Sequence, residues 1–293
     1  AKSMSELKVR KSPDLGMLLH DNFTLNTFTK EKWIILSIPE QALRTKVKNT
    51  GTPLREWGAT IINGIKTGCN DAFIIDEQKR SEILNSCVSD EERKTTEALI
   101  KPILRGKDVQ RYKAGWKGLY VIFAYNGSYK FLEKDCPAIF KHLSYFEDEL
   151  KNRGQVRNTP SKKKKNSDYL GQHHWLELDN NPSCKKKEEY EQEKIVYREI
   201  STSMNAYLDK NGMFVNNKLY FIIAEHAPYL TGVVNSSLFT KVILASANTT
   251  GGKGPAFLLD IKVPKYESKW HSIEEKVNTI SESPESDHKK EEH

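Results

Sequence analysis

The 293-residue sequence lacks the features of a membrane or secreted protein. No stretch approaches the roughly 20 apolar residues of a membrane-spanning helix, and residues 1–10 lack the apolar core of a signal peptide. The four cysteines lie far apart, without the paired spacing of a zinc site or a disulfide framework. We therefore expect reduced thiols, a cytoplasmic location and no membrane partner.

Motifs of several enzyme classes are missing as well. There is no Gly-x-Gly-x-x-Gly or P-loop, and Gly251–Gly254 lacks the spacing of a nucleotide site. The Asn-Pro-Pro-Tyr segment that binds a flipped adenine does not occur. Glu77-x-Lys79, Glu92-x-Lys94 and Glu274-x-Lys276 have the minimal Glu-x-Lys pattern, but none follows an apolar strand with a matching Pro-Asp. The adjacent His173–His174 have no further ligand at metal spacing. We predict no catalytic site, cofactor or metal in this chain.

The residues that are present indicate a folded and basic protein. Aromatic residues make up 10% of the sequence, which is too many for a disordered chain of this charge. Lys and Arg number 46 against 39 Asp and Glu, and the net charge of +7 favours a polyanionic partner such as nucleic acid.

Apolar periodicity predicts helices and strands mixed along the chain. The predicted helices cover residues 38–49, 89–100, 137–153 and 228–245. The predicted strands cover residues 59–68, 72–76, 119–125, 194–200, 214–224 and 258–263, of which the first two form a hairpin-like unit. Residues 153–187 are polar and lysine-rich, as in a long loop, and a helix from His271 leads into a charged tail. The pattern predicts a mixed α/β (α+β) fold.

Three segments carry side chains suited to DNA. In Gly64–Asn70, glycines free the backbone of an exposed turn, where Lys66, Thr67 and Asn70 offer one cation and two hydrogen-bonding groups. The alternative is a tight turn between strands, which the sequence favours equally.

The second segment, Ile103–Tyr112, has recurring cations around a glycine. Arg105, Lys107 and Arg111 could contact DNA, with Asp108 holding Arg105 or Arg111 through a paired hydrogen bond. The alternative is a surface network of salt bridges.

The third segment, Lys151–Lys165, contains seven cations and no acidic residue. Such a run gains free energy by displacing counterions from phosphates, although a solvated basic loop is the alternative. Trp175 could stack on a base, but a core position is the commoner one.

These segments, in this order, resemble the TaqI-like specificity domain at the C-terminal end of adenine-specific DNA methyltransferases and type IIG restriction enzymes. Gly51–Asp76 is similar to the opening signature of that family and Lys101–Tyr112 to its second block. The later blocks that resemble the family are Pro137–Arg153, Trp175–Leu178, Glu193–Tyr197, Tyr229–Ser236 and Ile261–Pro264. The resemblance extends from about Trp33 to about Tyr266.

The resemblance implies a bacterial target-recognition domain with a mixed, mainly antiparallel sheet flanked by helices. This domain would cover residues 51–266, with a basic insertion near 153–187, after a lead-in of residues 1–50 and before a charged tail of residues 267–293. The expected DNA contacts are Lys66, Thr67, Asn70, Arg105, Lys107, Arg111, Arg153, Gln155, Arg157, Asn158, Lys162, Lys163, Lys164 and Lys165. Of these, Gln155, Arg157 and Asn158 are candidate base readers, and Lys162–Lys165 would serve phosphates.

The resemblance also implies a partner that performs the chemistry. A methyltransferase or endonuclease domain or subunit would act on the bound duplex, and S-adenosylmethionine and magnesium are expected only in those missing catalytic parts. Two alternatives remain: a diverged metal-dependent endonuclease, and a scaffold subunit for a separate methyltransferase.

Overall fold

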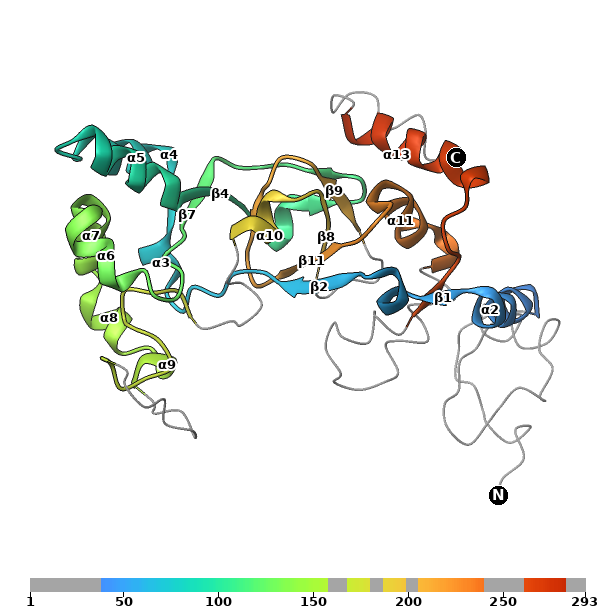
Figure 1. Ribbon diagram of the computed structural model, residues 1–293, viewed down its shortest axis with the longest axis horizontal. Coiled ribbons are helices and arrows are strands. Elements are labelled where there is room, and N and C mark those ends of the chain that lie inside the picture. The colour runs from blue at the N-terminus through green and yellow to red at the C-terminus, as the bar shows by residue number, and fades with distance from the viewer. Residues whose placement is uncertain (1–37, 158–167, 180–186, 199–204, 240–260, 283–293) are drawn as a thin grey trace, which may run out of the picture. The chain divides into compact units, whose positions relative to one another are not determined.

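The computed structural model describes residues 38–157, 168–179, 187–198, 205–239 and 261–282 (Figure 1). The chain divides into two compact units: unit 1 comprises residues 1–56 and 236–265, and unit 2 comprises residues 57–235 and 266–293. In the described ranges, no helix is long and apolar enough to cross a membrane.

The described residues of unit 1 include a helix and a short strand pair. Helix α2 (Ile38–Thr50) confirms the predicted helix, and it ends where the Gly51 amide donates to the Val47 carbonyl at 2.8 Å. Strand β1 (Thr52–Pro53) then pairs antiparallel with β12 (Lys262–Val263).

The first sheet of unit 2 has four strands in the order β10-β4-β7-β3. Its strands are β3 (Ile74–Asp76), β4 (Ile100–Leu104), β7 (Leu119–Ile122) and β10 (Phe214–Val215). Only the β10–β4 pair in this sheet is parallel. Two capped helices connect β3 to β4: α4 (Glu77–Asn85), where Asp76 accepts from the Lys79 amide, and α5 (Asp90–Leu99), where Ser89 accepts from the Glu92 amide.

More helices gather around this sheet at one end of unit 2 (Figure 1). They are α3 (Asn70–Phe73), α6 (Tyr129–Asp135), α7 (Pro137–Ser144), α8 (Glu147–Lys151) and α9 (Gly154–Arg157). The single helix predicted over residues 137–153 is therefore wrong, because Phe146 leaves the helical conformation with φ −110° and ψ 19°. Its apolar stripe is nevertheless buried, since Ile139, Leu143 and Leu150 are all fully inaccessible.

The second sheet is antiparallel, with the order β2-β11-β8-β9. Its strands are β2 (Thr60–Asn63), β8 (Lys194–Arg198), β9 (Tyr207–Asp209) and β11 (Leu219–Ile223). The predicted pairing of residues 59–68 with residues 72–76 is wrong, because β2 and β3 belong to different sheets. After β2, the Gly64 amide donates to the Leu219 carbonyl of the second sheet, and the Ile65 amide donates to the Val215 carbonyl of the first sheet. The chain thus passes from one sheet to the other at these two residues.

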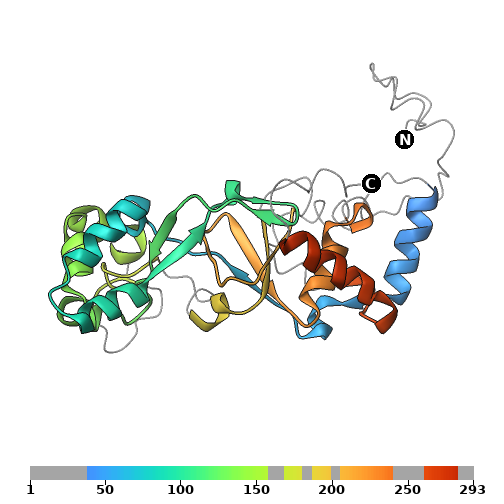
Figure 2. The ribbon, with the colours of Figure 1, turned by 90° about the horizontal axis from the view of Figure 1, so that it is seen from above.

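Short elements complete unit 2. Helices α11 (Ala227–Asn235) and α13 (His271–Glu282) lie side by side, and a Cβ on Gly232 of α11 would meet Ile273 of α13 (Figure 2). The remaining elements are η4 (Gly106–Asp108), the β5 (Val109–Gln110) and β6 (Lys113–Ala114) hairpin, α10 (Lys187–Glu191) and η9 (Ser268–Trp270). The architecture is mixed α/β with mainly antiparallel sheets flanked by helices, which confirms the predicted fold class.

Candidate nucleic-acid interface

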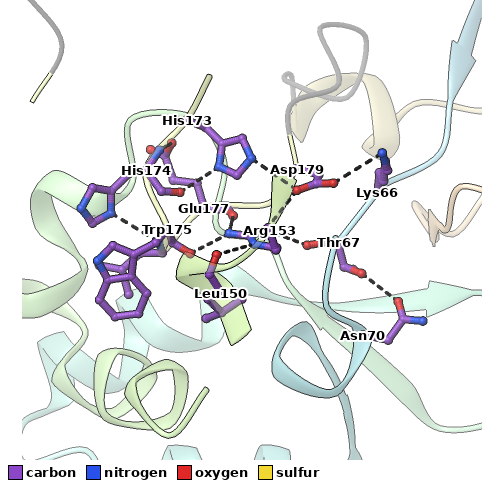
Figure 3. Close-up of polar contacts among 11 residues, drawn as sticks. Lys66, Thr67, Asn70, Leu150, Arg153, His173, His174, Trp175, Glu177 and Asp179 are labelled. Carbon is purple, nitrogen blue, oxygen red and sulfur yellow. Dashed lines mark hydrogen bonds and ion pairs between the residues drawn. The ribbon is translucent and has the colours of Figure 1, made fainter. Parts of the chain in front are cut away.

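Arg153 is a buried guanidinium that ties distant segments together (Figure 3). The residue is 6% exposed. Its nitrogens donate to the carbonyls of Leu150 (3.1 Å), Thr67 (2.8 Å), Trp175 (2.6 Å) and Glu177 (2.7 Å). The prediction that Arg153 stands on an exposed basic run is therefore wrong, because its donors are committed to the protein backbone and to Asp179.

The carboxylate of Asp179 contacts three cationic or potentially cationic groups (Figure 3). Arg153 Nη1 lies 3.4 Å and His173 Nε2 3.3 Å from Oδ1, while Lys66 Nζ lies 3.5 Å from Oδ2. Burial alone would raise the pKa of Asp179, but the contacts with His173, Arg153 and Lys66 outweigh burial and lower the pKa. Asp179 is therefore ionised at neutral pH.

The turn Gly64–Asn70 rests directly on this carboxylate. Gly68 has φ +69°, and a Cβ there would collide with Asp179 and Arg153. Thr67 is buried and donates to Asn70 Oδ1 at 2.8 Å, so the prediction of an exposed Thr67 is wrong. Lys66 and Asn70 are exposed, and the Lys66 side chain keeps 51% of its surface despite its ion pair.

The basic run Lys151–Lys165 begins at this cluster. Gln155 is half-buried and Arg157 is exposed, whereas Asn158 and Lys162–Lys165 lie outside the described residues. Trp175 packs at 6.5 Å from Phe140, between ring centroids, in a half-buried position.

His173 and His174 are engaged within the protein. Nδ1 of His173 lies 2.8 Å from the His174 carbonyl, and its Nε2 faces Asp179. In the ranges that the structure describes, no group of three His, Cys, Asp or Glu side chains is arranged to hold a metal ion.

Arg105 is held in the second segment by a bidentate ion pair. Its Nε and Nη2 lie 2.9 and 3.1 Å from the two carboxylate oxygens of the buried Asp108, which also accepts from the Arg105 amide. Burial would raise the pKa of Asp108, but Arg105 and Lys107 lower it below its usual value. The expected pairing of Asp108 with Arg105 is confirmed, and Lys107 is exposed beside the pair.

The β5–β6 hairpin carries Arg111 and Tyr112 at its tip. The guanidinium carbon of Arg111, which is exposed, lies 5.1 Å from the centroid of the Tyr112 ring. Tyr112 has φ +63°, and its amide donates to the Ala206 carbonyl at 2.8 Å. The same carbonyl accepts from Asn235 Nδ2 at 2.8 Å.

Sequence reasoning did not single out Tyr112 or Asn235 as site residues. A left-handed tyrosine has no sequence signature, because turn propensities favour glycine and asparagine there. Asn235 lies within the Tyr229–Ser236 block of the family resemblance.

Comparison with known proteins identifies the family. The model of the TaqI-like C-terminal specificity domain matches residues 101–258, more than half of the 293-residue chain. The chain belongs to the family of TaqI-like C-terminal specificity domains. A search of curated proteins gives no match.

Two solved structures are similar to the chain at low sequence identity. One is the type IIL restriction-modification enzyme MmeI, solved in complex with DNA, with 8% identity, a TM-score of 0.39 and coverage of 62% of this chain and 21% of that chain. The other is the type IIG restriction endonuclease BpuSI, with 13% identity, a TM-score of 0.47 and coverage of 82% and 28%. The chain thus spans less than a third of either enzyme.

Proposed function

We propose that this chain recognises a specific sequence in double-stranded DNA, as the specificity part of a restriction-modification or adenine methyltransferase system. Membership in the family of TaqI-like specificity domains is the observation that carries this proposal. Methyl transfer and cleavage would belong to a methyltransferase or endonuclease domain or subunit, which would use S-adenosylmethionine and magnesium.

The charge distribution at the candidate interface supports a polyanionic ligand. Lys66, Lys107 and Arg111 are exposed, whereas the acidic residues beside them, Asp108 and Asp179, are buried and ion-paired with arginines. The charges of Asp108 and Asp179 are therefore neutralised inside the protein, whereas these three cations face solvent, as favours phosphate binding.

Salt-dependent binding of the whole chain to duplex DNA tests the proposal. We expect the logarithm of the binding constant to fall linearly with the logarithm of salt concentration, with a slope of about −0.9 for each phosphate neutralised. The triple substitution Lys66→Ala, Lys107→Ala and Arg111→Ala should make this slope shallower by up to about 3.

Lys94→Ala is the matched control. Lys94 is an exposed cation on α5, a helix that also carries Asp90, Glu91, Glu92 and Glu97, so a phosphate is not favoured there. This variant should keep the slope of the unmodified chain. Binding that is insensitive to salt, or magnesium-dependent cleavage of plasmid DNA by the chain alone, would contradict the proposal.

A further inference from the structure

Tyr112 occupies a backbone conformation that disfavours its own side chain. Its φ of +63° lies in the left-handed region, where a bulky residue costs free energy and glycine does not. Two-residue hairpin connections accordingly favour Gly, Asn or Asp. The strained backbone at Tyr112 points to a use for its ring, which lies against the guanidinium of Arg111.

The tip of the hairpin is held by hydrogen bonds on several sides. The Tyr112 amide bonds to the Ala206 carbonyl, which Asn235 also contacts from the end of α11. Arg198 Nε donates to the Val109 carbonyl at 2.9 Å, at the start of the hairpin. The Arg111–Tyr112 tip is therefore presented on a fixed frame, as a reading element requires.

The hairpin region is strongly basic. Residues 105–118 contain five cations and a single acidic residue, Asp108, which is buried in its pair with Arg105. Lys107 and Lys117 are exposed on either side of the exposed Arg111. The surface around the tip thus offers positive charge without a competing exposed carboxylate in the same stretch.

We propose that the β5–β6 hairpin enters the major groove of the DNA, where Arg111 reads a guanine. This inference rests on the proposed function and deepens it. A two-stranded ribbon fits the major groove, and a guanidinium there can donate two hydrogen bonds to guanine O6 and N7. Tyr112 orients the guanidinium plane through its cation–π contact, and Lys107 and Lys117 contact the flanking phosphates.

The test begins by selecting the duplex that the whole chain prefers from a random library. Each guanine in that duplex is then replaced by 7-deazaguanine, which lacks the N7 acceptor. We expect one replacement to weaken binding of the unmodified chain by roughly 5-fold, the lower end of the range for one bidentate base contact, because the O6 acceptor remains. Arg111→Ala should bind the normal and replaced duplexes equally, whereas Lys94→Ala should behave like the unmodified chain.

The variant Tyr112→Gly tests the role of the tyrosine ring separately from the stability of the fold. Glycine relieves the left-handed strain, so the thermal midpoint should stay the same or rise, while the preference for the guanine falls. Because stability does not fall together with selectivity, a loss of selectivity in this variant is not a loss of folding.

Different results overturn the two proposals. The proposed role of the tip would be overturned if the chain bound a specific duplex that contained no guanine, or if 7-deazaguanine had no effect on specific binding. It would also be overturned if Arg111→Ala or Tyr112→Gly kept the full preference for the guanine. DNA recognition by the chain would then stand. If the unmodified chain showed no salt-dependent binding to DNA, the proposed function itself would be overturned.

Discussion

Replacing Arg153 by Met should destabilise unit 2 severely without a proportionate effect on the salt dependence of DNA binding. The substitution keeps an unbranched side chain but removes the donors to four carbonyls and the ion pair with Asp179. Removing one partner of a buried ion pair costs about 3–5 kcal/mol. Lys66 and His173 still contact Asp179 in this variant, but the four carbonyls lose their donor, which adds to the cost. We expect a loss in that range.

Urea unfolding followed by tryptophan fluorescence measures this loss. With a denaturant slope of about 2 kcal/mol per molar urea, the midpoint should fall by roughly 1.5–2.5 M. Arg153→Lys should lose most of the same stability, since one ammonium cannot reach carbonyls on several segments. Lys66→Met is the matched control: it removes another cation from Asp179, but from a side chain that is 51% exposed, so the cost should stay below about 1 kcal/mol.

A small change in stability would refute this reasoning. If Arg153→Met unfolds within about 0.3 M of the unmodified protein while its DNA affinity falls and its salt slope becomes shallower, Arg153 contacts DNA. The sequence-based interpretation would then be correct and the buried network would not hold the fold.

Two further predictions concern other buried groups. Asp209→Asn should lower the free energy of unfolding by about 3–5 kcal/mol in thermal denaturation, because its partner Lys194, 2.5 Å away, is equally buried and would lose its counter-charge. The double variant with Lys194→Met should recover much of this stability. Burial, aided by His173 and Lys151, lowers the pKa of His174 to about 4 from 6.5. Its contribution to stability is thus complete above pH 6.5 and is lost as the pH falls toward 4, so His174→Phe should flatten the pH dependence of the unfolding free energy in this window. An unchanged pH profile would show that His174 is not the group responsible.

Local signals in the sequence located several elements correctly. Helix α5 follows an N-cap serine, and α2 ends at a glycine, so both could be placed from neighbouring residues. Strand partners depend on contacts distant in sequence. Apolar runs bordered by glycines identified β2 and β3 as strands, but such runs contain no information on which sheet each strand joins.

In the candidate site, the burial and partners of a side chain could likewise be predicted only where they depend on neighbours in the sequence. A lysine- and arginine-rich run favours solvent exposure, and Arg153 is buried only because carbonyls of Thr67, Trp175 and Glu177 converge on it. Asp108 was easier to assign, because its partner Arg105 is three residues away. Arg111 was identified by its charge, but the conformation of Tyr112 depends on its bond to Ala206, far along the chain.

The hydrogen bond that anchors the hairpin tip joins two backbone groups, the amide of Tyr112 and the carbonyl of Ala206. Such a bond needs only an amide hydrogen at position 112, which every residue but proline supplies, and it places no demand on the side chain at position 111. Exchanging Arg111 for another polar residue therefore alters the chemistry offered to a ligand while the supporting frame stays in place. Under the proposed role of the tip, single substitutions at position 111 would change the preferred target without a cost in folding.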